Sequence, residues 1–350
     1  MTNRFWPSLK LIAQVRIARG ILCNLEFDNI FPNFLRGDEL IDLQYMHQIL
    51  SSLYLSNKLE NLSMGIIKAL GKEIGTWCSC HRLFLVDANV DYWNRMQWYS
   101  HGTINRLETA RAFIQDENVN IGQRFELACA YYLEADARTL FENMSSEYRN
   151  YFRTRKFEDK SRRFWVDALE TSAPLDWLQI SRSVVFRKFY KKDTQHFFHK
   201  NFIGLLQLFP KLENSHARLK SILNSIGRSE LHPFDFYLCL SQMDDNELDN
   251  VFNYLSKEQR LSVCKSFLHW PLQSLFLKVL ERLRTNMSAQ WYFDLFVFIL
   301  CEKLTSDWFD YDYVDLVKQI WSSVSYNVKR FIERREIFQY LEKVLDYDGQ

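Results

Sequence analysis

Apolar residues recur every three or four positions along most of the chain, with polar and charged residues between them. Positions three and four apart share one face of an α-helix, so this spacing predicts amphipathic helices, each with one buried side. No stretch shows the comparable alternation of apolar and polar residues that predicts a strand. The clearest helical sets are Leu107, Ala110 and Ile114; Leu219, Ile222, Leu223 and Ile226; and Phe276, Leu277, Leu280 and Leu283.

Two short motifs predict where helices begin. Asp244-Asp-Asn-Glu247 and Ser256-Lys-Glu-Gln259 each place a capping residue three positions before a Glu or Gln. In a capping box the two side chains satisfy each other's backbone N–H groups at the first turn of a helix. Both motifs precede an apolar-periodic stretch, which agrees with the helical interpretation.

The composition points to the same fold class. Only 10 Gly and 6 Pro occur in 350 residues, while Phe, Tyr and Trp make up 16%. Average usage is roughly 7% Gly and 5% Pro, and sheet-based folds need many turns that these residues form. An all-α fold with short connections is therefore predicted. At roughly 150 residues per domain, the length fits about two domains or one extended array.

Two stretches more than a hundred residues apart resemble each other. Residues 124–149 read RFELACAYYLEADARTLFENMSSEYR, and residues 234–260 read FDFYLCLSQMDDNELDNVFNYLSKEQR. With one residue inserted after position 139, five identical pairs align: Cys129 with Cys239, Phe141 with Phe252, Ser145 with Ser256, Glu147 with Glu258 and Arg149 with Arg260. The offset of 110 to 111 residues is close to three times 37.

A spacing of about 37 residues also separates the predicted helix starts. These lie at Arg124, Arg162, Phe198, Phe234, Leu272 and Phe309, at intervals of 38, 36, 36, 38 and 37 residues. Prolines, which open or end helices, recur similarly: Pro174 and Pro210 lie 36 apart, and Pro233 and Pro271 lie 38 apart. Two helices with short loops occupy 30 to 40 residues in any helical chain, so an irregular bundle is the alternative.

The predicted architecture is accordingly an α-solenoid-like array of helix hairpins with a period of about 37 residues. Residues 86–350 would form the array, and residues 1–85 a helical N-terminal unit that caps it. The irregular helical bundle remains open beside this prediction.

One segment is similar to a known group of proteins. Residues 92–144 contain Gly102-Thr103-Ile104, Asp116-Glu117 and an Arg124-Phe-Glu-Leu-Ala-Cys-Ala-Tyr131 core. This pattern resembles a large group of uncharacterised arthropod proteins of similar length. Tyr132 stands where that group has a second Cys, and the match covers about one seventh of the chain. The resemblance implies a shared helical architecture and no particular activity.

Common catalytic and cofactor motifs do not occur. The chain lacks G-x-G-x-x-G, G-x-x-x-x-G-K-[ST], G-x-S-x-G and H-E-x-x-H, so nucleotide-binding loops, nucleophile elbows and zincin helices are not predicted. No cofactor, metal or catalytic residue is assigned. An enzyme whose residues meet only in the folded chain is left open as an alternative function.

Two clusters have metal-ligand chemistry but unfavourable spacing. Cys78-Ser-Cys80-His81 offers thiolates and imidazole, yet it lacks the usual two-residue gap and a second cluster. His196 and His199 share a helical face but lie among lysines that repel a cation. The seven cysteines are odd in number and scattered, as expected for reduced thiols, so no disulfide framework is predicted.

The stretch DWFDYDYVD at 307–315 crowds four carboxylates into nine residues. It lacks the Gly and Glu of an EF-hand loop, so the acids are interpreted as favouring a helix N-terminus. The aromatic residues Trp308, Tyr311 and Tyr313 are predicted to pack or to form a partner-binding lip.

Charge is distributed unevenly, although the net charge is only +1. Residues 149–200 carry 13 Lys and Arg against 6 Asp and Glu, a net charge of +7, interleaved with aromatic residues. Such a segment is typical of a solvated face, of a surface for an acidic protein, or of a nucleic-acid site. Its candidate partner-binding residues are Arg153, Arg155, Lys156, Arg162, Arg163, Lys188, Lys191 and Lys192.

The predicted function is non-catalytic protein–protein interaction, with a partner bound along the helical-repeat surface. Nucleic-acid binding through 149–200 is the alternative. Charged residues interrupt every apolar run near the N-terminus, and the run at 295–301 is far shorter than the ~20 residues of a membrane span. An intracellular protein, cytoplasmic or nuclear, is expected; the absence of acids before Glu26 leaves a mitochondrial presequence as the alternative.

Overall fold

The structure is a computed structural model of the 350-residue chain. It describes residues 5–23, 43–81, 84, 92–154, 160–177, 179–180, 203–226, 231–284, 287–305 and 309–347. Within these ranges the regular structure is helical, and β-type pairing is limited to an isolated bridge between Trp98 and Ile104. The prediction of an all-α fold is confirmed.

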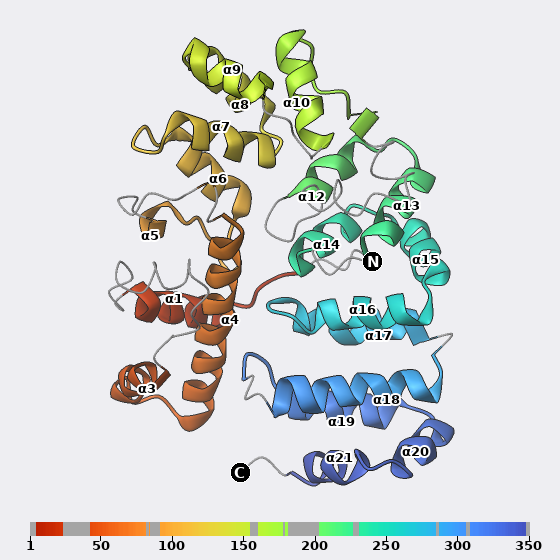
Figure 1. The fold of residues 1–350 in the computed structure, drawn as a ribbon. Coiled ribbons are helices and arrows are strands. Elements are labelled where there is room, and N and C mark those ends of the chain that lie inside the picture. Colours follow the sequence, from red (N-terminus) through yellow and green to blue (C-terminus); the bar gives the residue numbers. More distant parts are fainter. Residues whose placement is uncertain are drawn as a thin grey trace.

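The first half of the chain forms the left side and the top of the molecule in Figure 1. Its helices are α1 (Leu9–Cys23), α3 (Leu43–Ser52), α4 (Asn57–His81), α5 (Tyr92–Arg95), α6 (Arg106–Gln115), α7 (Ile121–Ala130), α8 (Glu134–Asn143), α9 (Ser146–Thr154) and α10 (Lys160–Glu170).

The second half descends along the right side of Figure 1. Its elements are α12 (Gly204–Leu208), η1 (Phe209–Lys211), α13 (Ser215–Ile226), α14 (Pro233–Leu240), α15 (Asp245–Tyr254), α16 (Lys257–Phe267), η2 (Leu272–Leu275), α17 (Phe276–Leu283), α18 (Ala289–Val297), η4 (Phe298–Leu304), α19 (Tyr313–Ser323), α20 (Tyr326–Glu333) and α21 (Phe338–Leu345). The segments η1 and η2 are 3₁₀ turns, and η4 is a π-helical extension of α18.

Local signals in the sequence set the helix starts. Both predicted capping boxes form: Asp244 and Glu247 cap α15, and Ser256 and Gln259 cap α16. The predicted apolar faces also point inward, because Ile222 and Ile226 of α13 and Phe276 and Leu280 of α17 are buried.

Helix α4 is a brace that runs past the ends of many other elements. It is the longest described helix, with 25 residues, which corresponds to about 37 Å. Figure 1 shows it standing upright beside the helices of the second half. From its first turn to its last, it contacts Asp312 through Lys58, the backbone of 309–310 through Gly65, His232 through Glu73 and Tyr131 through His81. For these four contacts, all with residues beyond position 130, the residue number in α4 rises as the partner's number falls.

Successive helix pairs of the second half lie in layers. In the lower part of Figure 1, α16 and α17, then α18 and α19, then α20 and α21 follow one another downward. Contacts between layers join α15 to α17, α16 to α18, α18 to α20 and α19 to α21.

Arginines link neighbouring layers at the edges. Arg282 of α17 forms an ion pair with Asp245 of α15, and Arg284 donates to the carbonyl of Ser323 at the end of α19. Arg218 of α13 lies 3.4 Å from Glu247 of α15.

The layers do not keep a constant interval. Helices α15, α17, α19 and α21 begin at Asp245, Phe276, Tyr313 and Phe338, so successive starts are 31, 37 and 25 residues apart. The predicted period of 37 residues applies to one of these three steps. Helix and loop lengths vary because each layer packs through its apolar faces, which a fixed residue count does not control.

The two similar stretches do fold alike, as three helices each. Helices α7, α8 and α9 correspond to α14, α15 and α16, and the buried residues Ala137, Leu140 and Phe141 fall on Leu248, Val251 and Phe252 at an offset of 111. The extra residue lies in the turn before α15 and not after position 139. An insertion inside a helix would rotate its apolar face by about 100°, whereas a turn absorbs it.

Candidate functional site

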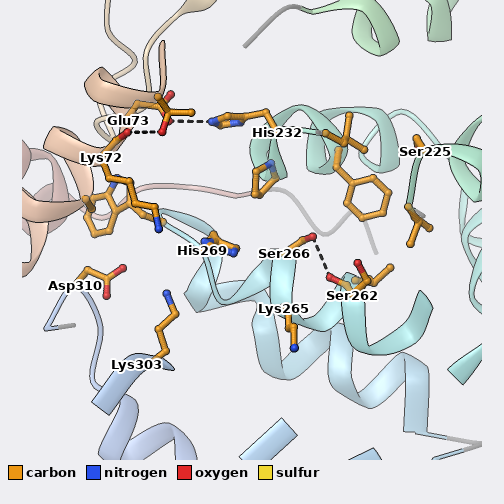
Figure 2. A pocket seen from close by; sticks show the side chains of 18 residues that line it. Lys72, Glu73, Ser225, His232, Ser262, Lys265, Ser266, His269, Lys303 and Asp310 are labelled. Carbon is orange, nitrogen blue, oxygen red and sulfur yellow. Dashed lines mark hydrogen bonds and ion pairs between the residues drawn. The ribbon is translucent and has the colours of Figure 1, made fainter. Parts of the chain in front are cut away.

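A pocket with a volume of about 380 Å³ lies where α4 meets the helix pairs. We call it the junction pocket. Its walls come from α4, the end of α13, the start of α14, α16, the turn at 269–270, η4 and Asp310. Figure 2 shows its polar side chains, of which these carry titratable groups: Lys72, Glu73, His232, Lys265, His269, Lys303 and Asp310.

A buried polar network forms one wall of the junction pocket. Glu73 of α4 accepts hydrogen bonds from the backbone N–H of Ile104 at 3.2 Å and from His232 Nε2 at 3.0 Å, and it lies 3.4 Å from Arg106 Nη1. The other end of the Arg106 guanidinium forms an ion pair with Asp235 of α14. The network therefore ties α4, the start of α6 and the start of α14 together.

The ionisation of Glu73 follows from these partners. Burial opposes the charged carboxylate, but His232, Arg106 and the Ile104 amide together lower the pKa of Glu73 to about 2. The Nδ1 atom of His232 accepts from the backbone N–H of Phe234 at 3.2 Å, so the ring proton lies on Nε2 and is donated to Glu73. His232 also caps the first turn of α14.

Basic side chains gather at the opposite end of the junction pocket. Lys72 comes from α4, Lys303 from η4 and His269 from the turn after α16, and in Figure 2 the two amino groups point toward each other beside the imidazole. Burial lowers the pKa of Lys303, and the charge on Lys72 lowers it further against the effect of Asp310. Burial, with the charges of Lys303 and Lys72, lowers the pKa of His269 to about 3.

Asp310 completes this end of the junction pocket. Its side chain is 3% exposed, and its Oδ2 atom accepts from Gln273 Nε2 at 2.6 Å. The Oδ1 atom is buried and has no hydrogen-bond partner among the described residues. The hydroxyl of Tyr313 also lies beside the Asp310 carboxyl, and it donates to the carbonyl of Leu268 at 3.2 Å. Burial raises the pKa of Asp310, against the opposing effects of Lys303 and of its hydrogen bonds.

A second candidate surface lies on the terminal layer, α20–α21. Three tyrosines there are more than half exposed: Tyr326 by 70%, Tyr340 by 54% and Tyr347 by 56%. Arg330 lies 5.8 Å from the ring centre of Tyr326, and Lys343 lies 5.8 Å from that of Tyr340. We call these five residues the terminal tyrosine surface.

The basic segment predicted from the sequence lies mostly outside the described residues. Arg155, Lys156, Lys188, Lys191 and Lys192 are not described, and neither are His196 and His199; for Arg162 and Arg163, only the backbone in α10 is described. Arg153 is exposed at the end of α9, lies 3.8 Å from Glu170 and covers the ring of Phe141. Of the eight candidate cations, the described part of the structure places only the side chain of Arg153, and nucleic-acid binding through 149–200 stays a prediction.

The three aromatic residues of the predicted lip at 307–315 differ in their exposure. Trp308 lies outside the described residues, and Tyr311 is half-buried. Tyr313 is 1% exposed, so its ring packs inside the molecule and is not offered to a partner. Of the acidic residues, Asp312 acts as expected at a helix start, because it caps α19 by accepting from the backbone N–H of Asp315.

In the Cys78-Ser-Cys80-His81 cluster, both imidazole nitrogens already have hydrogen-bond partners. His81 Nδ1 lies 2.6 Å from the carbonyl of Trp77, and its Nε2 lies 2.8 Å from the hydroxyl of Tyr131, so both nitrogens are hydrogen-bonded. Burial raises the pKa of Cys78 well above its usual value. Among the described residues, no group of three potential ligands is arranged for a metal.

Sequence reasoning missed the junction pocket. Its titratable residues are spread along the sequence from Lys72 to Asp310, and no local motif joins them all. A lysine with apolar neighbours, such as Lys303 within LFVFILCEKL, is the signal that could have indicated a buried cation.

The chain matches no protein-family model and no curated protein. The resemblance of residues 92–144 to the arthropod group therefore stays a prediction, as do the boundary between residues 85 and 86 and the cellular location. None of the helices in the described ranges combines the length and hydrophobicity that a membrane span requires.

Proposed function

We propose that this chain is a non-catalytic helical-repeat protein that binds another protein. In this proposal the layered helix pairs form an array of the α-solenoid type, braced by α4. Arrays of this kind offer long surfaces, and their end layers have one face without a neighbouring layer.

The terminal tyrosine surface carries the proposal. Tyrosine and arginine are enriched at protein interfaces, because they combine a large apolar area with hydrogen-bonding ends. Tyr326, Tyr340 and Tyr347 lie on the last layer, and helices α20 and α21 bury only Val328, Ile332 and Leu341. The three tyrosine rings are thus largely exposed and are not part of the packing within this layer.

The cations beside these rings favour an acidic partner. Between Tyr326 and Lys343 there are five Lys and Arg residues against three Glu. A carboxylate of the partner would meet Arg330 or Lys343 beside a tyrosine ring, and docking would remove this charge pair from water, where it gains in strength.

The test is quantitative co-purification at an ionic strength of about 0.15 M. The wild-type chain is expected to retain one protein partner in stoichiometric amount. The triple variant Tyr326→Ser, Tyr340→Ser, Tyr347→Ser should retain at least tenfold less, since hot-spot tyrosines contribute about 2 kcal/mol or more each.

A matched control is Tyr151→Ser. Tyr151 is 50% exposed on α9, at the opposite end of the molecule in Figure 1, so its replacement should leave the partner bound. Recovery of no stoichiometric partner by the wild-type chain, or equal loss in the triple variant and the control, would contradict the proposal.

A further inference from the structure

Helix α1 is apolar on both of its long faces. Its inner face, which includes Val15, Ala18 and Leu22, is buried, and the helix packs on α4. Its outer face carries Leu9, which is 86% exposed, and Ile17, which is 38% exposed. A surface helix ordinarily turns polar side chains outward, and a helix that is apolar all round is covered on both sides. The outer face of α1 therefore has the composition of a docking surface.

The exposed residues of α1 have an apolar centre between two cationic edges. At about 100° per residue, their order around the helix axis is Arg16, Leu9, Gly20, Ala13, Ile17 and Lys10. We call these six residues the outer strip. Trp6, which lies just before the helix, is 78% exposed. Figure 1 shows α1 on the opposite side of α4 from the layers α16–α21.

The charge on this part of the chain is entirely positive. No Asp or Glu occurs before Glu26, so the outer strip carries two cations and no anion. Neither Lys10 nor Arg16 has an ion pair among the described residues. A third cation, Arg19, lies on the flank of the helix over the ring of Trp98, at 5.3 Å from its centre. Charge complementarity therefore calls for an anionic partner.

The order of residues across the outer strip favours a flat lipid surface over a protein. A helix in a membrane interface places its apolar residues below the headgroups and its Lys and Arg side chains at the level of the phosphates. Lys10 and Arg16 flank the apolar centre in this way. Trp6 supplies an amphipathic ring of the kind enriched at membrane–water interfaces. An acidic protein would instead need a groove with carboxylates on both rims to match one convex helix.

We propose that the outer strip of α1, together with Trp6, docks on an anionic lipid surface. Helix α1 stays packed on α4 and lies parallel to that surface. Lys10 and Arg16 attract the chain to the headgroups, and Trp6, Leu9 and Ile17 enter the boundary between headgroups and acyl chains. This docking does not depend on the terminal tyrosine surface, which belongs to α20–α21 and the residues after them.

Co-sedimentation with lipid vesicles tests the proposal. Vesicles of phosphatidylcholine containing about 30% phosphatidylserine should bind the wild-type chain at least tenfold more tightly at low salt than vesicles of phosphatidylcholine alone. Raising the ionic strength to about 0.5 M should weaken this binding, because salt screens the headgroup charge. Equal binding to the two kinds of vesicle, or binding to neither, overturns the proposal.

Apolar variants locate the contact. The double variant Trp6→Ser, Leu9→Ser should bind the anionic vesicles at least tenfold more weakly, because both side chains leave the apolar part of the interface. The control is Tyr54→Ser, which removes a ring that is 96% exposed in the turn between α3 and α4 and should leave binding unchanged. Circular dichroism checks that each variant is folded. Equal binding by the double variant and the control contradicts the proposal.

Charge variants give a second, independent measurement. Lys10→Gln with Arg16→Gln should weaken binding to the anionic vesicles by about tenfold or more and should reduce its salt dependence. The matched control is Lys257→Gln with Lys278→Gln, which removes the same charge from exposed positions on α16 and α17. If both pairs weaken binding equally, the whole charge of the protein and not the outer strip is responsible, and the proposal fails.

A protein at the same face would give a different pattern. If the α1 variants lose a co-purified acidic protein but bind vesicles as wild type does, the outer strip docks a protein and the lipid proposal is overturned. The triple variant of the terminal tyrosine surface should bind anionic vesicles as tightly as wild type. The two proposals can therefore fail separately.

Discussion

At the scale of single residues, Arg106 is a buried cation that lies between two buried carboxylates. It is 3% exposed and lies between Glu73 and Asp235, so its charge offsets two buried carboxylates. Arg106→Met should lower the free energy of unfolding by about 3 to 5 kcal/mol, because both carboxylates lose a buried partner. Urea denaturation followed by circular dichroism measures this loss.

The same helix provides the control for Arg106. Arg111 of α6 forms an exposed ion pair with Glu108, and Arg111→Met should change stability by less than about 1 kcal/mol. Similar losses in the two variants would show that the buried network does not stabilise the fold.

His101 gives the protein a predictable acid sensitivity. It lies among the rings of Phe5, Tyr99 and Phe234, its Nε2 atom has no hydrogen-bond partner among the described residues, and burial lowers its pKa from 6.5 to about 4. The unfolded chain therefore binds a proton more readily than the folded one, so stability falls as the pH drops from about 6.5 to 4.

The variant His101→Phe should reduce that pH dependence. A phenyl ring keeps the aromatic packing and cannot be protonated, so the variant should lose up to about 3 kcal/mol less stability than wild type between neutral pH and pH 4. Urea denaturation of both proteins at several pH values in this range measures the free energy of unfolding. If that free energy falls equally with pH in wild type and His101→Phe, the prediction is contradicted. Below pH 4.5 both proteins should lose further stability as Glu73, with its pKa of about 2, becomes protonated.

Residue types alone did not reveal which side chains are buried. The sequence of 307–315 left open whether its aromatic residues pack or form a partner-binding lip, and in the structure Asp310 and Tyr313 lie inside the molecule. Helix α4 passes directly over the backbone of 309–310, and Tyr313 packs against Leu268 and Gln273; both contacts join segments too far apart for local sequence to indicate.

At the scale of elements, Gly65 sets how closely α4 approaches its neighbours. A Cβ atom at this position would lie 2.2 Å from the backbone of both Phe309 and Asp310, which cannot move aside as a flexible side chain could. Gly65→Ala should destabilise the protein by about 1 to 3 kcal/mol through overpacking, despite the better helix propensity of Ala.

Gly20 is the matched position for Gly65. It lies in α1, and a Cβ atom added there would have nothing within 4 Å, so Gly20→Ala should stabilise the protein by up to about 1 kcal/mol. Thermal denaturation of the two variants should show shifts of opposite sign. A shift of the same sign in both would refute the close approach of α4.

Elements were predictable where their signals are local. The capping boxes of α15 and α16 and the apolar faces of α13 and α17 follow from residues within one or two turns of each other. The number of residues between successive layers was not predictable. It depends on loop lengths and on short segments such as the 3₁₀ turn η2 and the π-helical η4, which adjust to packing between layers.

At the scale of the whole molecule, burial differs strongly between α4 and the terminal layer. Helix α4 has twelve buried residues, whereas α20 has two and α21 has one. Hydrogen exchange followed by mass spectrometry should show amides of α4 exchanging far more slowly than those of α20 and α21, because local opening follows the extent of burial. Equal protection across these helices would contradict the order of stability inferred from the packing.

The junction pocket belongs to this scale as well. Lys72, His269, Lys303 and Asp310 converge only because α4 runs antiparallel to the order of the layers, and nothing within a short sequence window encodes that path.

A stack of helix pairs can bend when each layer contacts only the adjacent layers. Here a single rigid rod of 25 residues touches segments from Asp312 back to Tyr131, so bending of the stack would have to break contacts at both ends of that rod. We therefore expect α4 to limit bending of the stack, so that a partner would meet a surface whose shape changes little on binding.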